Sequence, residues 1–129
     1  MKKKILIVDD EKVWLKMLAM LLEHEGYQLE VAFDAIQATT QAVRLKPDLI
    51  LLDIMMPAGG GLAALKNIRT NLRTFSIPVI VLTAKGDKET KEIVEELGVS
   101  GYFSKSVDMD ELLKKIKEIF ECSSSGGRV

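Results

Sequence analysis

Three short segments of this chain are almost wholly apolar, and they constrain the fold more than any other feature. They are Lys4–Val8, Leu49–Asp53 and Val79–Thr83, each rich in Ile, Leu and Val. Short runs of branched apolar residues are typical of strands. A strand that is apolar on both faces must be covered on both faces, as are the central strands of a parallel sheet. The chain therefore predicts a parallel sheet between two layers of helices.

Segments with apolar residues at helical spacing alternate with the strands. We expect two further strands at Gln28–Ala32 and Gly101–Ser104. Five helices are expected at Val13–Glu25, Ile36–Lys46, Leu62–Asn71, Lys88–Leu97 and Met109–Glu121. This alternation predicts an α/β fold built from right-handed βαβ units in a doubly wound sheet.

Residues at the expected helix ends support these boundaries. Three helices are followed by residues that terminate helices, namely Gly26, Pro47 and Gly98. Two pairs have the three-residue spacing of a capping box: Asp34 with Gln37, and Asp108 with Glu111.

Length and charge exclude several classes of protein. The 129 residues suit one domain, which we expect over residues 1–122, with 123–129 as a flexible tail or linker remnant. A net charge of -1 gives no reason to expect nucleic acid or an anionic membrane as a partner. No apolar run approaches the roughly 18 residues of a membrane span, and no signal peptide is visible. With one cysteine, Cys122, the chain fits a reducing compartment, and we expect a cytoplasmic protein.

Polar residues end four of the expected strands. Asp9 and Asp10 follow the first, Asp53 ends the third, Thr83 ends the fourth, and the fifth leads into Lys105. In open α/β sheets the chemistry lies at the carboxyl ends of the strands, so these side chains should converge.

The converging residue types indicate phosphoryl transfer. Three close carboxylates repel one another unless a cation is present, and an all-oxygen donor set favours Mg²⁺, Mn²⁺ or Ca²⁺ over zinc. Two carboxylates suffice to hold Mg²⁺, and the third can act as a nucleophile toward a phosphoryl group. Lys105 can neutralise phosphoryl oxygens, and Thr83 can donate a hydrogen bond to one of them.

The sequence resembles the receiver domain of two-component response regulators, including the single-domain chemotaxis regulator. The likeness covers residues 4–120 and rests on "ILIVDDE", "PDLILLDIMMP", "GLAALKNIR", "IPVIVLTA" and "GYFSK". It implies a flavodoxin-like five-stranded parallel sheet with strand order 2-1-3-4-5 and five helices. It also implies a phosphohistidine on a histidine kinase or phosphotransfer domain as donor, and a downstream output protein or domain.

The resemblance also assigns roles to individual residues. Asp53 is implied to be the phosphoacceptor, and Lys105 to bind the phosphate. Asp9 and Asp10 are the implied acids of the Mg²⁺ site. We expect Asp10, Asp53 and the Met55 carbonyl to bind the metal directly and Asp9 to act through water. The implied switch residues are Thr83 and Tyr102.

Alternative interpretations exist for these features. The acidic pair can be a helix start in which Asp10 caps and Glu11 faces the positive dipole end. The domain can be a docking module that is never phosphorylated. It can also be a phosphohydrolase, although such enzymes usually have a second acid where this chain has Met55. We therefore expect a signalling domain that catalyses only its own phosphorylation and slow dephosphorylation.

Two further expectations depend on details of the sequence. On the first helix we expect one buried face, formed by Trp14, Met17, Leu18, Leu21 and Leu22. Leu15 and Met20 should then be exposed and form part of the kinase-binding surface. The family usually has a cis proline after the lysine, and here we expect Lys105–Ser106 to be cis although Ser106 is not proline. Three consecutive glycines, Gly59 to Gly61, suggest a mobile loop after Asp53.

Overall fold

The computed structural model describes residues 2–57, 60–84 and 87–126. Within them lies one parallel sheet with the order β2-β1-β3-β4-β5. Its strands are β1 (Lys4–Val8), β2 (Gln28–Ala32), β3 (Leu49–Leu52), β4 (Val79–Thr83) and β5 (Gly101–Ser104). The predicted fold class and strand order are confirmed, and four of the five strands have the predicted bounds.

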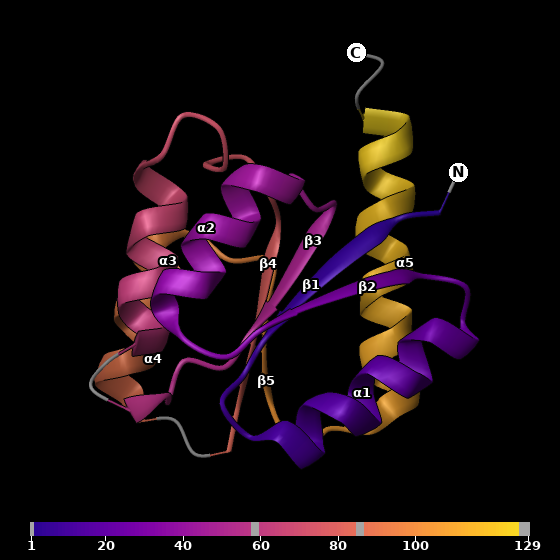
Figure 1. Cartoon of the computed structure of the whole chain (residues 1–129), viewed down its shortest axis with the longest axis horizontal. Coiled ribbons are helices and arrows are strands. Elements are labelled where there is room, and N and C mark those ends of the chain that lie inside the picture. The colour runs from indigo at the N-terminus through magenta and orange to yellow at the C-terminus, as the bar shows by residue number, and fades with distance from the viewer. Residues whose placement is uncertain (1, 58–59, 85–86, 127–129) are drawn as a thin grey trace.

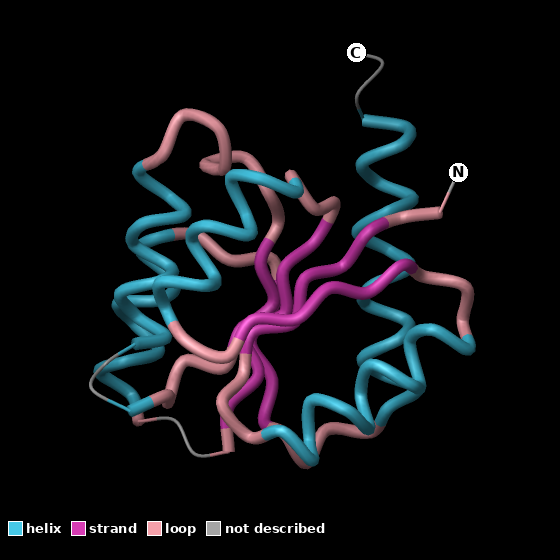
Figure 2. Tube along the Cα trace, in the orientation of Figure 1, coloured by secondary structure: helices cyan, strands magenta, loops and turns pink. Residues whose placement is uncertain are grey.

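Helices cover both faces of the sheet (Figures 1 and 2). They are α1 (Lys12–His24), α2 (Ala35–Leu45), α3 (Gly60–Thr70), α4 (Lys88–Leu97) and α5 (Met109–Gly126). The helices α2, α3 and α4 lie on one face, and α1 and α5 lie on the other. Among the described residues, none of the helices is both long enough and apolar enough to cross a membrane.

The central strands are buried on both faces because alternate side chains enter two separate cores. From β1, Leu6 and Val8 pack in the core under α2 and α3, and Ile5 and Ile7 pack in the core under α1 and α5. All four side chains are buried. This arrangement explains why these strands are apolar throughout rather than alternating.

Hydrogen bonds at the helix starts show a reciprocal pairing at one of the two predicted capping boxes. Asp34 accepts from the Gln37 N–H at 2.8 Å, and the Gln37 side chain accepts at 2.8 Å from the N–H of Phe33, the residue before the N-cap Asp34. Asp108 instead accepts from the Asp110 N–H at 2.8 Å. Its reciprocal pairing with Glu111 is therefore not formed, because the Asp108 oxygen closes a tighter turn.

Helix α1 presents a different face to the sheet from the one we predicted. Its buried residues are Leu15, Leu18 and Leu22, spaced by three and four positions. The prediction that Leu15 is exposed is wrong, since only 4 % of this residue is accessible. Met17, predicted to be buried, is 53 % exposed. Met20 is 63 % exposed, as predicted.

Helix α5 continues to Gly126, past its predicted end at Glu121. The apolar periodicity that we used to place its end stops before the backbone helix does. Residues 127–129 of the expected tail lie outside the described part of the chain.

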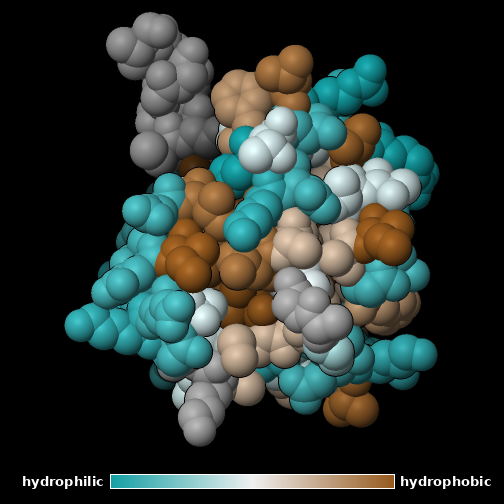
Figure 3. Space-filling model, turned by 90° about the vertical axis from the view of Figure 1, so that its left-hand side faces the viewer, coloured by the Kyte–Doolittle hydropathy of each residue, from teal (hydrophilic) through white to brown (hydrophobic). Residues whose placement is uncertain are grey.

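Hydrophobic side chains are also present on the surface. On the side that carries α3 and α4 they gather in the middle of the view, and hydrophilic side chains surround them (Figure 3). On the opposite side, α1 exposes Val13, Met17 and Met20. Contiguous exposed apolar side chains are typical of surfaces that bind other proteins.

Candidate functional site

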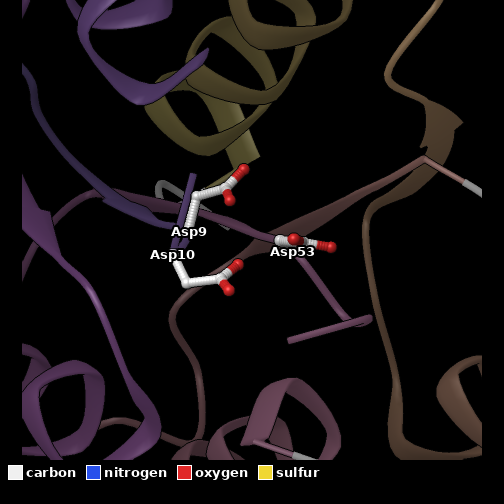
Figure 4. A group of neighbouring side chains, drawn as sticks. All are labelled: Asp9, Asp10 and Asp53. Atoms are coloured by element: carbon white, nitrogen blue, oxygen red, sulfur yellow. The ribbon is translucent and has the colours of Figure 1, made fainter. Parts of the chain in front are cut away.

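The site begins where β1 and β3 end side by side. The two strands pair in register, with Val8 opposite Leu52. The residues that follow them are therefore neighbours, and the side chains of Asp9, Asp10 and Asp53 gather at this edge of the sheet (Figure 4). One oxygen of each lies within 4.8 Å of the others. The predicted convergence of the three acids is confirmed.

Backbone hydrogen bonds hold two of these carboxylates. Asp9 Oδ1 accepts from the Glu11 N–H at 2.9 Å, and Asp53 Oδ1 accepts from the Met55 N–H at 3.0 Å. Both side chains are buried, whereas Asp10 is exposed. The N-cap of α1 is Glu11, and among the described residues no side-chain hydrogen bond caps this helix. The alternative in which Asp10 caps the helix is therefore wrong. The exposed Asp10 carboxylate remains accessible to a cation.

Lys105 reaches this cluster from the end of β5. Its backbone N–H donates to the Thr83 carbonyl at 2.8 Å, which ties it to the neighbouring strand. Its Nζ lies 2.8 Å from Asp9 Oδ2 and 3.4 Å from Asp53 Oδ2. It also lies 5.4 Å from the centroid of the Trp14 ring, a cation–π distance. The predicted position of Lys105 beside the acids is confirmed, and Trp14 lies beside the same ammonium.

A third carboxylate binds the same ammonium group. Glu11 Oε1 lies 2.5 Å from Lys105 Nζ. From the sequence we expected Glu11 only as a helix-start residue, because a contact across 94 positions leaves no periodic signal. The adjacent glutamate in "VDDE" was the one available hint.

Burial and pairing shift the protonation equilibria of these groups. Burial raises the pKa of Asp9, and the charge of Asp53 adds to that rise, while hydrogen bonds from Lys105 and the Glu11 N–H oppose it. Burial disfavours the charged form of Lys105. Its hydrogen bonds to Asp9 and Glu11, and the charges of Asp53 and Asp9, outweigh burial and raise its pKa. Lys105 is therefore a permanent cation at neutral pH.

The peptide bond after Lys105 is trans, because the described residues contain no cis peptide bond. The prediction that the Lys105–Ser106 bond is cis is therefore wrong. Lys105 nevertheless contacts Asp53 at 3.4 Å.

A close backbone approach shapes the loop that follows Asp53. A Cβ atom on Gly61 would lie 2.3 Å from the Asp53 carbonyl oxygen and 2.5 Å from the Ile54 Cα. Only glycine allows α3 to come so near to the strand end. Gly60 and Gly61 belong to α3 rather than to a mobile loop, and Gly59 lies outside the described residues. Gly60 and Gly61 are therefore not part of the mobile loop that we expected after Asp53.

Two buried hydroxyl groups belong to Thr83, at the end of β4, and to Tyr102, the second residue of β5. Neither Thr83 Oγ1 nor the Tyr102 hydroxyl has a hydrogen-bond partner among the described residues. Burial raises the pKa of Tyr102, and the charges of Asp87 and Glu95 contribute to the rise. Strands β4 and β5 pair with Val81 opposite Tyr102 and Thr83 opposite Ser104. Because neither has a partner among the described residues, both hydroxyl groups are available as hydrogen-bond donors.

The oxygen donors of the site fit a hard divalent cation. Two oxygens that both bind Mg²⁺ at 2.0–2.1 Å lie at most about 4.2 Å apart. The observed limit of 4.8 Å allows two direct carboxylate ligands and a third that acts through water. The site can thus hold a cation beside the Asp53 carboxylate, which also lies 3.4 Å from the Lys105 ammonium.

Comparison with known proteins identifies the family of this fold and site. Residues 5–117 match the family model for the response regulator receiver domain. The chain is 38% identical over 124 residues to the phosphate regulon transcriptional regulatory protein PhoB of Pseudomonas aeruginosa, covering 96% of this chain and 54% of that protein. It is 35% identical over 116 residues to the DNA-binding dual master transcriptional regulator RpaA of Synechocystis, covering 90% of this chain and 48% of that protein. The chain spans about half the length of these relatives.

Solved structures resemble the whole fold. A CheY-like response regulator receiver domain protein from Methanospirillum hungatei has a TM-score of 0.86 and 30% identity, with 97% of this chain and 99% of that chain covered. The receiver domain of the sensor histidine kinase PA1611 from Pseudomonas aeruginosa has a TM-score of 0.82 and 29% identity, with 92% and 97% covered. That structure has a magnesium ion coordinated in its active-site cleft.

Proposed function

Because this chain belongs to the response regulator receiver family of two-component systems, we propose that Asp53 accepts a phosphoryl group in a Mg²⁺-dependent reaction. The donor is a phosphohistidine on a histidine kinase or a histidine phosphotransfer domain. One observation carries this proposal: the buried Asp53 carboxylate lies beside two other carboxylates and 3.4 Å from the Lys105 ammonium. A nucleophilic oxygen, donors for a cation and a fixed positive charge thus occupy one site.

In the proposed step an oxygen of Asp53 attacks the phosphorus atom. A P–O bond forms as the P–N bond breaks, and the electron pair of that bond returns to the imidazole nitrogen. The Met55 N–H holds Asp53 Oδ1 at 3.0 Å and so orients the carboxylate before the attack. Lys105 supplies hydrogen bonds and positive charge to the phosphoryl oxygens.

The proposed metal ligands are the carboxylates of Asp10 and Asp53 and the Met55 carbonyl, with Asp9 acting through water. Bound Mg²⁺ supplies positive charge that offsets the charge of the phosphoryl oxygens. The magnesium ion in the related PA1611 receiver domain supports this choice of metal.

Thr83 and Tyr102 are the proposed switch residues. Thr83 Oγ1 is buried without a partner, so donating a hydrogen bond to a phosphoryl oxygen would relieve an unsatisfied group. A move of Thr83 toward Asp53 would change the space next to Tyr102, which packs against the core under α2, α3 and α4. Through these two residues, phosphorylation changes the conformation of the surface that the output protein or domain binds.

The domain acts as a signal rather than as a turnover enzyme. Phosphohydrolases with an aspartyl nucleophile use a second acid two residues later, and this chain has Met55 there. Without that acid the aspartyl phosphate is hydrolysed slowly and persists long enough to be recognised. The reader is an output protein or an output domain, and we place the system in the cytoplasm.

The exposed apolar face of α1 is the proposed contact for the phosphodonor protein. It consists of Val13, Met17 and Met20, spaced by four and three positions. Met20 was expected in this surface from the sequence, and Val13 and Met17 replace the buried Leu15. This face begins two residues after Glu11, the N-cap of α1, and thus starts at the end of the helix that carries the acids.

Labelling with a small phosphodonor tests the proposal. Incubation with acetyl phosphate and Mg²⁺ should add one phosphoryl group, measured as the intact mass of the protein. The same incubation with EDTA should add none. A domain that stays unlabelled with Mg²⁺ would instead be a docking module without phosphoacceptor function.

A further inference from the structure

We infer that Glu11 restrains Lys105 before phosphorylation and so limits the rate at which Asp53 captures a phosphoryl group. Glu11 is thus a positioning residue that acts through the lysine. This inference rests on the proposed function of Asp53.

The Lys105 ammonium has three N–H groups and three carboxylate neighbours. Its Nζ lies 2.5 Å from Glu11 Oε1, 2.8 Å from Asp9 Oδ2 and 3.4 Å from Asp53 Oδ2. The shortest of these contacts therefore goes to Glu11, and the longest goes to Asp53. An ammonium group has no further donors, so a phosphoryl oxygen on Asp53 needs one that is now in use.

Burial decides which of the two shorter contacts, to Asp9 or to Glu11, is released more easily. The Asp9 side chain is 2% exposed, so separating it from its cation would leave a buried unpaired charge. The Glu11 side chain is 61% exposed, so its carboxylate can be hydrated as soon as it leaves the lysine. Exchange of Glu11 for a phosphoryl oxygen consequently costs less than exchange of Asp9, and it frees the shorter of these two contacts.

The neighbouring structure fixes the backbone of Glu11, and its exposed side chain extends from there to the Lys105 ammonium. The Glu11 N–H donates to Asp9 Oδ1 at 2.9 Å, and the Glu11 carbonyl accepts from the Leu15 N–H at 3.0 Å in the first turn of α1. Trp14, one turn along the helix, places its ring 5.4 Å from the same ammonium. Glu11 and Trp14 thus hold Lys105 from one helix, and only Glu11 competes with the phosphoryl group for hydrogen bonds.

A double-mutant cycle at saturating Mg²⁺ tests this inference. The measured quantity is the initial rate of labelling by acetyl phosphate in four proteins: the wild type, Glu11→Gln, Lys105→Ala and the double variant. Glu11→Gln should label about two- to fivefold faster than the wild type, the range expected from an exposed ion pair. In the Lys105→Ala background, Glu11→Gln should leave the rate unchanged, because no lysine remains to be released.

Two results would overturn this inference and leave the proposed function of Asp53 intact. The first is a Glu11→Gln rate equal to or below that of the wild type. The second is the same gain in both backgrounds, which would assign the effect to general repulsion between Glu11 and the anionic donor. Failure of wild-type labelling would instead overturn the proposed function and this inference with it. Thermal unfolding of Glu11→Gln should match the wild type, since the replaced side chain is largely exposed.

Discussion

Lys105 Nζ lies closer to Asp9 Oδ2, at 2.8 Å, than to Asp53 Oδ2, at 3.4 Å. The lysine is therefore first a counter-ion for the most buried acid of the site. One ammonium shared among several carboxylates compensates each of them only in part. The pKa of Asp9 is accordingly raised, with burial as the main cause.

Replacement of Asp9 should stabilise the protein when no metal is bound. In EDTA we expect Asp9→Asn to increase the free energy of unfolding by about 1 kcal/mol, because a poorly compensated buried charge is removed. Urea denaturation measures the change. Added Mg²⁺ should stabilise the wild type more than the variant, since binding to the folded state alone favours that state. A variant less stable than the wild type in EDTA would mean that pairing with Lys105 outweighs the burial of Asp9.

Gly61 should tolerate no side chain. A Cβ atom there would lie 2.3 Å from the Asp53 carbonyl oxygen, and backbone cannot move aside as a flexible side chain can. We expect Gly61→Ala to destabilise the fold by about 1–3 kcal/mol or more.

Gly60→Ala is the matched control for this substitution. Its Cβ atom would make only ordinary contacts, at 3.7 Å from Met56 Cβ and 3.9 Å from Ala35 Cβ. Because alanine favours helices over glycine, Gly60→Ala should be neutral or stabilising. Equal urea midpoints for the two variants would contradict the close approach at Gly61.

Thr83 and Thr74 should respond in opposite ways to the same change. Both are buried, but Thr83 Oγ1 has no partner among the described residues, and Thr74 Oγ1 donates to the Ile68 carbonyl at 2.7 Å. Thr83→Val removes an unsatisfied hydroxyl and should stabilise by about 1 kcal/mol. Thr74→Val leaves a carbonyl unpaired and should destabilise by about 1–2 kcal/mol. Thermal unfolding curves with shifts of the same sign would refute this difference.

Met20→Asp should impair transfer from a phosphorylated histidine kinase and leave labelling by acetyl phosphate unchanged. The reason is that Met20 is exposed on the apolar face of α1 and does not contribute to the buried cores. Transfer rates from the two donors provide the measurement. Leu15→Asp is the contrasting variant, because a charge at this buried position should unfold the protein and slow both reactions. If Met20→Asp slowed both reactions equally, the surface assignment would be wrong.

The strands and the acids could be predicted because each leaves a local signal. Strands that are buried on both faces appear in the sequence as continuous apolar runs. The bounds of β1 and β4 were predicted correctly from these runs alone. Asp9 and Asp53 follow such runs directly, and parallel strands bring their ends to one edge. The family motifs then supplied the strand order.

The remaining features depend on tertiary contacts that the sequence pattern does not encode. Several apolar residues of α1 fit more than one stripe, and only packing against the sheet selects Leu15 over Met17. The contact of Glu11 with Lys105 joins distant positions without any periodicity. The peptide bond at Ser106 also differs from the family expectation.

The position of the phosphoryl group tests the central claim most directly. After incubation with acetyl phosphate and Mg²⁺, reduction with borohydride converts an aspartyl phosphate to homoserine, which peptide mass spectrometry locates. We predict homoserine at position 53 of the wild type and no labelling of Asp53→Asn. Homoserine at another position, or undiminished labelling of Asp53→Asn, would contradict the assignment of Asp53 as the phosphoacceptor.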